Sequence, residues 1–365
     1  MRVLESIDDI ASLGKEWERL RSDCGGGIFS SHHMVMEWLE AFHEMAEPRF
    51  LCMEREGALV AIAPFVLGRR RHMGLKVKTL YMAGWANQTL EYHDIGILHR
   101  SGEEDLVPLL EGLGKLDWNL LSLNGLTDSP FHHALIERAQ SKWPDAQIER
   151  IPCPYLDIAD QDDVTRLFGS RNRRTVRKLL RELSEAERLD STILRSQEDM
   201  ERAMLMYVEL HRQRWSYRGG SIFQDARQRD FLVGMVKSVA ERSEGRIYEM
   251  RIDGVLAAQA LCLFDPGMAR IYRISMNDEL MDYSPGYLLF QHMLTDLKGE
   301  GIGKVDLGAG AEDFKYRLGA KDAYLLGLRL DRGSLKMASR LGKMPGLERV
   351  LRDTGLRDRF LGGVC

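Results

Sequence analysis

The feature that most constrains this chain is an order of predicted elements that occurs twice. In each half, a turn of one acid and one glycine precedes a strand of small apolar residues. The turns are Glu56-Gly57 and Asp253-Gly254, and the strands cover 58–68 and 255–264. Helices precede both turns, and another strand, a helix and a short strand follow. Because the order repeats while residue identity barely does, the sequence predicts a tandem duplication of one α/β unit.

The length and one irregular segment suggest where the two halves meet. A chain of 365 residues suits two domains of roughly 100 to 200 residues each. Residues 151–163 contain two prolines and several acids without a helical period, which is typical of a boundary. We therefore expect an N-terminal domain over 1–150, a C-terminal domain over 151–335 and a basic tail over 336–365.

Composition excludes several classes of protein. The content of 44% hydrophobic and 29% charged residues is typical of globular chains, and the net charge of −4 gives no overall attraction for DNA. No apolar run reaches the ~20 residues of a membrane-spanning helix, and residues 1–20 lack a signal-peptide pattern. We expect a cytoplasmic protein without membrane insertion. The five scattered cysteines form no C-x-x-C pair, so neither a disulfide framework nor a metal site is predicted.

The most informative stretch lies between 269 and 310, where a strand leads to a Ser-Pro-Gly helix start. Ser284 is placed to cap the helix and Pro285 suits its first position. Gly286, Tyr287 and Leu288 are then expected to present free backbone N–H groups at the positive helix end, where a pyrophosphate can bind. An ordinary helix start explains the same tripeptide.

A wider set of motifs carries a resemblance to a known family. The motifs are Tyr283 to Leu289, Gly301, Asp306, Gly308, Gly310, Phe314-Lys315, Ser170 to Arg174, Leu210-His211, Arg214-Trp215, Trp38 and Gly57 to Phe65. This pattern resembles the tandem-GNAT acyltransferases of the CelD/BcsL group, relatives of the FemAB peptidyltransferases. The usual GNAT phosphate signature, Q/R-x-x-G-x-G/A, is absent, and Ser284-Pro285-Gly286 stands in its place.

The resemblance implies a fold and an activity. It implies two tandem GNAT-like α/β domains, each a mixed central sheet flanked by helices, with the donor site in the second domain. The first domain would serve the acceptor side or be degenerate, and the acceptor would bind in the cleft between domains. The implied reaction is direct transfer of an acyl group, most simply acetyl from acetyl-CoA, to an amine or hydroxyl of a small or sugar-like acceptor. An amino sugar or an amino acid would fit. Donor contacts are expected at Ile274, Ser275, Met276, Ser284, Gly286, Tyr287 and Leu288.

Acyl transfer needs an aligned acceptor, a place for its proton and donors for the developing oxyanion. In this fold the strand before the phosphate turn supplies the oxyanion N–H, here within 271–276. The resemblance assigns Lys315 to the transferring carbonyl and Tyr316 to protonation of the leaving thiolate. Asp306 at a strand end could receive the amine proton, and His211 could be a base. Each has an ordinary structural alternative: an exposed lysine, a packed tyrosine, a capping aspartate and a core histidine.

Acceptor contacts are expected in both halves of the chain. Trp85, Tyr92 and Asp94 fall in a loop that mixes aromatic and polar residues, as the rim of a cleft does, although such residues also pack long loops. Arg214 and Trp215 in the second half are further candidates.

Seven basic residues and no acid lie between Arg166 and Arg181. They predict either a solvated helix face or a docking surface for the CoA 3′-phosphate, a nucleotide-linked sugar or tRNA. Two alternatives to acyl-CoA chemistry therefore stay open: a FemAB-type transferase that uses aminoacyl-tRNA, and a non-catalytic binding protein on the same fold. The sequence does not indicate an oligomeric state.

Overall fold

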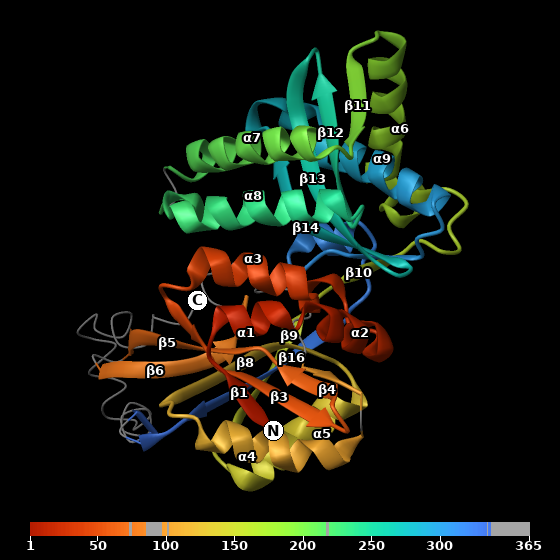
Figure 1. Cartoon of the computed structure of the whole chain (residues 1–365). Helices are drawn as coiled ribbons and strands as arrows, with labels where there is room; N and C mark the ends of the chain where they lie inside the picture. Colours follow the sequence, from red (N-terminus) through yellow and green to blue (C-terminus); the bar gives the residue numbers. More distant parts are fainter. Residues whose placement is uncertain (73–74, 85–96, 101, 217–218, 334, 337–365) are drawn as a thin grey trace, which may run out of the picture. The chain divides into compact units, whose positions relative to one another are not determined.

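The computed structural model describes residues 1–72, 75–84, 97–100, 102–216, 219–333 and 335–336. The chain divides into two compact units, one of Met1–Ile151 with Leu325–Cys365 and one of Pro152–Tyr324 (Figure 1). Within the described ranges, no helix has both the length and the apolarity that crossing a bilayer requires.

The first unit contains two mixed or antiparallel sheets with helices against them. One sheet has the order β1-β3-β4-β7, with β1 Arg2–Leu4, β3 Phe50–Arg55, β4 Ala58–Ala63 and β7 Leu98–His99. The other has the order β2-β5-β6-β8-β16-β9, with β2 Ala46–Pro48, β5 Phe65–His72, β6 Leu75–Met82, β8 Leu120–Thr127, β16 Tyr324–Asp331 and β9 Gln147–Pro152. The helices are α1 Ile7–Ser12, α2 Gly14–Cys24, α3 His32–Phe42, α4 Leu106–Lys115 and α5 Pro130–Lys142.

Proline and glycine determine two details of this unit. Pro64 separates β4 from β5, so a nearly continuous stretch passes from one sheet to the other at a residue without an N–H. The apolar spacing over 7–21 predicts a single amphipathic helix. This prediction is wrong, because the chain leaves helical geometry at Leu13 and forms α1 and α2 instead. A Cβ at Gly14 would lie 3.3 Å from the His32 ring, so the glycine permits close packing of α2 there.

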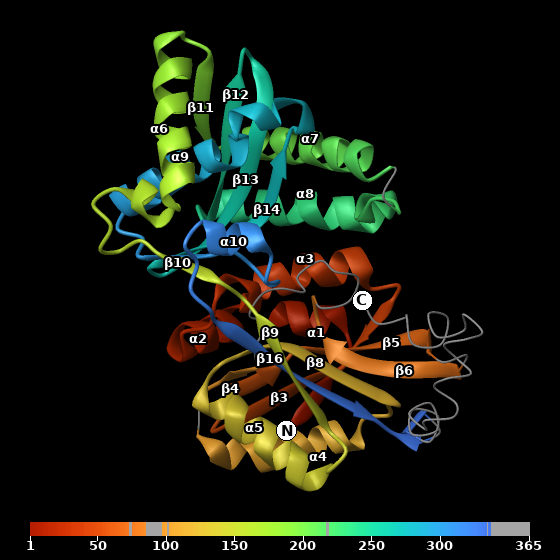
Figure 2. The same cartoon turned by 180° about the vertical axis from the view of Figure 1, so that it is seen from behind.

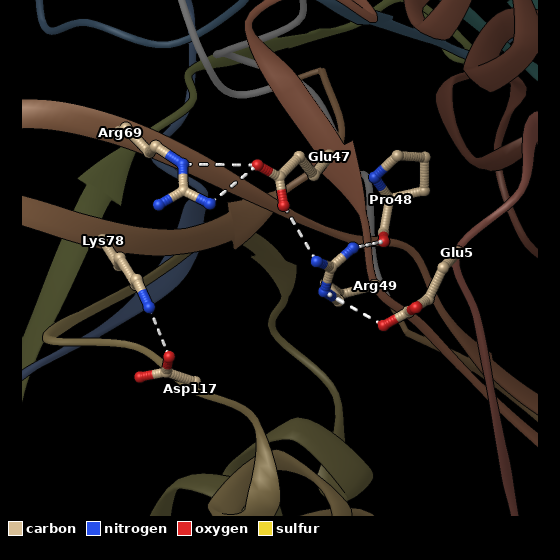
Figure 3. Close-up of polar contacts among 7 residues, drawn as sticks. All are labelled: Glu5, Glu47, Pro48, Arg49, Arg69, Lys78 and Asp117. Carbon is tan, nitrogen blue, oxygen red and sulfur yellow. Dashed lines mark hydrogen bonds and ion pairs between the residues drawn. The ribbon is translucent and has the colours of Figure 1, made fainter.

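Ion pairs tie strands together on the surface of the first unit (Figure 3). Glu47 on β2 accepts hydrogen bonds from Arg49 at 2.8 Å and from Arg69 on β5 at 3.0 Å. Arg49 also pairs with Glu5, and Lys78 on β6 pairs with Asp117. Because these groups are partly or largely exposed, solvent screens each pair and its contribution to stability is small. The cluster is a surface network that supports strand pairing.

The second unit is one six-stranded sheet between two layers of helices (Figures 1 and 2). The strand order is β10-β15-β14-β13-β12-β11, with β10 Tyr155–Asp157, β15 Lys304–Asp306, β14 Met268–Met276, β13 Val255–Asp265, β12 Gly245–Ile252 and β11 Leu189–Leu194. The helices are α6 Ser170–Glu185, α7 Gln197–Trp215, α8 Ala226–Glu241, α9 Pro285–Gly299 and α10 Asp313–Arg317. Helices α7 and α8 cover one face, and α6 and α9 cover the other.

The core of this unit lies between α9 and the sheet. Alternate residues of β12, including Tyr248 and Met250, pack there with Leu289 and Met293 of α9. Nearly every residue of β13 is buried, since helices cover both of its faces, which explains its run of small apolar residues.

The last strand differs from the prediction. The apolar run over 325–330 predicts a final strand within the domain expected over 151–335. The strand forms, as β16, but it pairs antiparallel with β8 of the first unit. Strands β9, β10 and β11 were not predicted at all. Strand β10 has only three residues, too few to show a periodic pattern, and strand pairing across many residues leaves no local signal in a sequence.

A buried histidine lies in the first unit. The His132 Nδ1 is 2.8 Å from the Thr127 hydroxyl and 3.0 Å from that of Ser129. Burial, assisted by the neighbouring His99, lowers the pKa of His132 to about 4. The imidazole is therefore neutral in the folded protein at neutral pH.

This histidine should make the protein less stable in mild acid. The unfolded chain protonates His132 near the ordinary pKa of 6.5, whereas the folded chain does not until about pH 4, so stability is lost as pH falls through this window. Between about pH 7 and about pH 5 the loss from this residue is roughly 2 kcal/mol. Urea unfolding of the wild type and His132→Gln at both pH values measures it. An equal pH dependence in the two proteins would contradict the assignment.

Candidate functional site

A groove of about 470 Å³ lies in the second unit, between the C-terminal part of α7 and the end of β14. Its lining includes six residues that the sequence had predicted for a site. They are His211, Arg214, Trp215, Ile274, Ser275 and Met276. Tyr207, Leu210, Gln213, Asn277, Asp278 and Glu279 complete the lining. The structure thus brings together the predicted acceptor residues of the second half with the strand predicted to contact the donor.

The groove lies beyond the point where two parallel strands separate. Strand β15 pairs with β14 only from Met268 to Arg270, and Arg270 is opposite Asp306, the last residue of β15. Beyond that point the described pairings of β14 are with β13 alone. The register of β13 and β14 also shifts between Leu261 and Cys262, which leaves Tyr272 as an extra residue. Residues 271–276, predicted to supply an oxyanion N–H, therefore form the separated end of β14.

A buried ion pair marks the point of separation. The Arg270 guanidinium donates to the Asp306 carboxylate at 2.7 Å and to Asp265 at 2.5 Å. The other oxygen of Asp306 accepts the Gly308 N–H at 2.8 Å. Burial raises the pKa of Asp306, although the Arg270 charge and the Gly308 N–H act in the opposite direction. Asp306 thus holds the strand end and the following loop, and its predicted role as a proton acceptor stays a prediction.

Lys315 is buried, with a side chain only 3% exposed, and is not the exposed lysine of the structural alternative. Its ammonium donates to the carbonyl oxygens of Gly308, Ala309 and Gly310 at 2.8, 2.7 and 3.0 Å. It also lies 2.8 Å from the Glu312 carboxylate. Because an ammonium has three protons, these partners use all of them. In this arrangement Lys315 holds the loop after β15, and its predicted contact with the transferring carbonyl stays a prediction.

His211 projects from α7 into an aromatic cluster beside the groove. Its ring is stacked on Trp215, with centroids 5.7 Å apart, and meets Phe223 edge to face at 5.1 Å. The Nδ1 atom is 2.8 Å from the Ser221 hydroxyl. Burial lowers the pKa of His211 to about 4, and the charges of Arg273 and Arg214 act in the same direction. The imidazole is neutral at neutral pH.

Arg214 and Trp215 supply charge and an apolar surface to the same groove. The Arg214 guanidinium lies 3.3 Å from the Asp278 carboxylate, and both side chains are partly exposed. Trp215 is 39% exposed and lines the groove, so its ring offers an apolar surface there.

The start of α9 differs from the prediction in its hydrogen bonds. Ser284 has the left-handed φ of 49° and its side chain makes no capping bond. The N–H groups of Tyr287 and Leu288 both donate to the Ser284 carbonyl, at 3.0 and 3.3 Å, so they are not free. Within the described part of the chain, the Gly286 N–H has no hydrogen-bond partner, and a Cβ on this residue would lie 2.6 Å from the Met276 sulfur. The helix start therefore offers one N–H rather than three.

Tyr316 and the first-half candidates lie apart from this arrangement or cannot be placed. Tyr316 is 40% exposed on α10, and its hydroxyl donates to Asp322 at 2.8 Å. It does not line the groove. Trp85, Tyr92 and Asp94 lie outside the described residues, as does most of the predicted tail. Among the residues that the structure describes, no three His, Cys, Asp or Glu side chains gather as a metal site would require.

The sequence did not predict several residues of the site. Tyr207, Ser221 and Arg273 surround His211, and Arg270 forms the buried pair with Asp306. Arg270 and Arg273 interrupt a largely apolar strand, and this was an available signal, because a buried guanidinium requires a carboxylate partner.

The comparisons agree with the fold. Residues 170–316 match the model of the acetyltransferase (GNAT) domain family. FemX superimposes with a TM-score of 0.55 and 10% identity, covering 91% of this chain and 98% of that chain. A tandem GNAT protein from the clavulanic acid biosynthesis pathway superimposes with a TM-score of 0.51 and 14% identity, covering 91% of this chain and 98% of that chain. The C-terminal domain of a putative lysylphosphatidylglycerol synthetase from Agrobacterium fabrum superimposes with a TM-score of 0.51 and 12% identity, covering 92% of this chain and 96% of that chain.

No curated protein matches the chain. At such low identities the solved structures show the fold alone. The predicted α/β fold of tandem GNAT-like domains is therefore confirmed, and residues 170–316 are similar to the GNAT acetyltransferase domain.

Loss of the Lys315 ammonium should destabilise the protein. Lys315→Met leaves the loop carbonyls without their buried donor, which is expected to lower the free energy of unfolding by about 2–4 kcal/mol. Lys321 provides a matched control, because it pairs with Asp157 while 59% exposed. Lys321→Met should cost much less, because solvent screens an exposed ion pair. Denaturant unfolding of both variants checks this, and equal losses would contradict the buried clamp.

Proposed function

We propose that the second unit transfers an acyl group from acyl-CoA, most simply acetyl from acetyl-CoA, to an amine or hydroxyl of a small acceptor. The transfer is direct, within a ternary complex of donor, acceptor and protein. An amino sugar or an amino acid is the proposed acceptor class. No metal takes part, and no covalent intermediate on the protein is needed.

The separation of β14 from β15 beside a groove is the observation that carries this proposal. Parallel strands that part after Arg270 leave backbone groups of β14 available to an extended ligand. The groove meets this strand over Ile274 to Asn277, so a donor along β14 and an acceptor in the groove would lie next to each other. Bringing the two reactants together is itself a large part of catalysis.

Positive charge near the start of α9 favours a phosphate-bearing donor. The Gly286 N–H belongs to the first turn of a 15-residue helix, whose dipole is positive at this end. Arg317 on α10 is close enough to influence Tyr287, and among the described residues it has no carboxylate partner. Asn172 donates to the Tyr287 hydroxyl at 2.7 Å and so fixes that ring beside the helix start. These groups are the proposed pyrophosphate contacts.

The groove suits a polar acceptor with some apolar surface. Trp215 offers an aromatic face, while Arg214 and Asp278 offer opposite charges at one wall. An amino acid or amino sugar presents the same combination of charged groups and carbon framework.

Binding of acetyl-CoA provides the first test. Calorimetry should detect binding at micromolar concentration to the wild type, and weakening by at least about tenfold in Gly286→Asp, because a carboxylate there repels the pyrophosphate. Gly286→Ala is the matched control, since it introduces the same contact with Met276 without charge. It should retain most of the affinity. Equal losses in both variants would assign the effect to packing, and absence of binding to the wild type would overturn the acyl-CoA proposal.

One observation favours aminoacyl-tRNA as the donor instead. Arg171, Arg174, Lys178 and Arg181 are exposed and spaced by three or four residues, so they share one face of α6. The row extends over ~15 Å of helix. Within the described chain, Lys178 alone of the four is near a carboxylate, that of Glu182 at 3.7 Å. Such a row is suited to a phosphate backbone.

This alternative makes a distinct prediction about salt. If three arginines contact phosphates, tRNA affinity should fall roughly 20- to 40-fold from about 50 to about 200 mM salt. Arg171→Glu with Arg174→Glu should abolish binding, while Arg229→Glu on α8 should not change it. Fluorescence titration with aminoacyl-tRNA measures both effects. Salt-independent or undetectable binding would remove the alternative, and loss of both acyl-CoA and tRNA binding would favour a non-catalytic protein.

A further inference from the structure

The Ser221 hydroxyl is nearly buried and has two neighbours. Ser221 is the N-cap of the 3₁₀ turn η5, Ile222–Gln224, and its oxygen accepts the Phe223 N–H at 3.1 Å. The same oxygen is 2.8 Å from the His211 Nδ1. Its residue is only 6% exposed. A hydroxyl in such a position needs an acceptor for its own proton.

The hydrogen bond between Ser221 and His211 decides which ring nitrogen of His211 carries the proton. Among the described residues, the only acceptor within reach of the Ser221 hydroxyl proton is His211 Nδ1, because Phe223 contributes a donor. If Nδ1 carried a proton and donated it to Ser221, the hydroxyl proton would be left without a partner in a nearly buried place. The satisfied arrangement has Ser221 donating to Nδ1. A neutral imidazole then carries its proton on Nε2.

The surroundings of the ring support a neutral donor. Protonation of His211 is disfavoured by burial and by the charges of Arg273 and Arg214, which lower the pKa of His211 to about 4. The stacked Trp215 and the perpendicular Phe223 fix the ring plane. The charges that disfavour an imidazolium also favour a negative oxygen nearby.

We propose that His211 acts in the groove as a hydrogen-bond donor through Nε2–H, and that Ser221 is the positioning residue that fixes this tautomer. The ligand atom is an oxygen that carries full or developing negative charge. It comes either from a carboxylate of the acceptor or from the carbonyl of the transferred acyl group. His211 is then not the base that removes the proton of the acceptor. The functional part of this inference depends on the acyltransferase proposed above, whereas the tautomer does not.

The tautomer can be measured on the full chain without any activity. Long-range ¹H–¹⁵N correlation spectra of protein labelled at histidine distinguish a protonated from an unprotonated ring nitrogen, and loss of signals in His211→Gln assigns them. We expect a proton on Nε2 in the wild type and loss of this fixed state in Ser221→Ala. Ser216→Ala, which removes an exposed hydroxyl nearby, should leave the spectrum unchanged. A proton on Nδ1 in the wild type, or an unaltered spectrum in Ser221→Ala, would overturn the proposal.

Binding of an oxygen anion is tested with acetate as the probe. Titration with acetate should shift the Nε2–H resonance of wild-type His211. Absence of any shift would overturn the donor role. Neither the tautomer spectrum nor the acetate titration depends on acyl-CoA. Failure of the proposed function and failure of this inference are therefore distinguishable.

Two amide substitutions separate a donor from a base in the transfer reaction. The glutamine side chain in His211→Gln places its NH₂ near the original Nε2, whereas the shorter amide in His211→Asn lies near Nδ1, and neither amide is a base. Loss of a donor to an oxyanion costs about 10²- to 10³-fold in rate. The transfer rate of His211→Gln should therefore be at least about tenfold higher than that of His211→Asn. Equal loss in both variants would overturn the donor role. A change confined to kcat indicates the acyl oxygen, and a change in KM for carboxylate acceptors alone indicates the acceptor.

Discussion

The second unit depends on the buried ion pair between Arg270 and Asp306. These residues lie opposite each other at the last paired position of β14 and β15, so the pair closes the ladder where the strands separate. Asp265 shares the arginine, and Gly308 and Lys315 extend the network into the following loop. Because removing one partner leaves a buried charge, such a pair costs about 3–5 kcal/mol to break. The position of the separation is therefore well defined.

The groove follows from this separation. Beyond Arg270, β14 keeps its pairing with β13 but has no β15 beside it, and the extra residue Tyr272 changes the course of the strand. Helix α7 covers the same face and brings His211 to the open end. The ion pair of Arg270 and Asp306 thus lies near one end of β14, and the aromatic cluster around His211 lies near the other. The strand segment between them is held at both ends. Preorganisation of this kind is what stabilisation of a developing charge requires.

The sequence predicted much of this unit and missed its polar contacts. Turn residues located β13, and the Ser-Pro-Gly sequence located the start of α9 and the strand before it, β14. His211, Arg214 and Trp215, chosen as candidate site residues, all line the groove. The hydrogen bonds of Lys315 and of the α9 start depend on tertiary packing, which leaves no periodic signal. The same holds for Ser221, which lies ten residues after His211 and contacts it only because a 3₁₀ turn returns the chain to α7.

The misplaced last strand shows a further limit of arguing from repeated element order. A tandem duplication suggests that each copy is one continuous segment, yet β16 lies between β8 and β9 in the sheet of the first unit. Residues 1–151 alone therefore lack an interior strand of that sheet, and the second unit, Pro152–Tyr324, is inserted in the chain of the first. Near the two connections, the Cys153 N–H donates to the Ala323 carbonyl and Tyr155 pairs with Lys321. Backbone pairing thus joins the entering and leaving segments of the second unit, which lets an inserted domain close on itself.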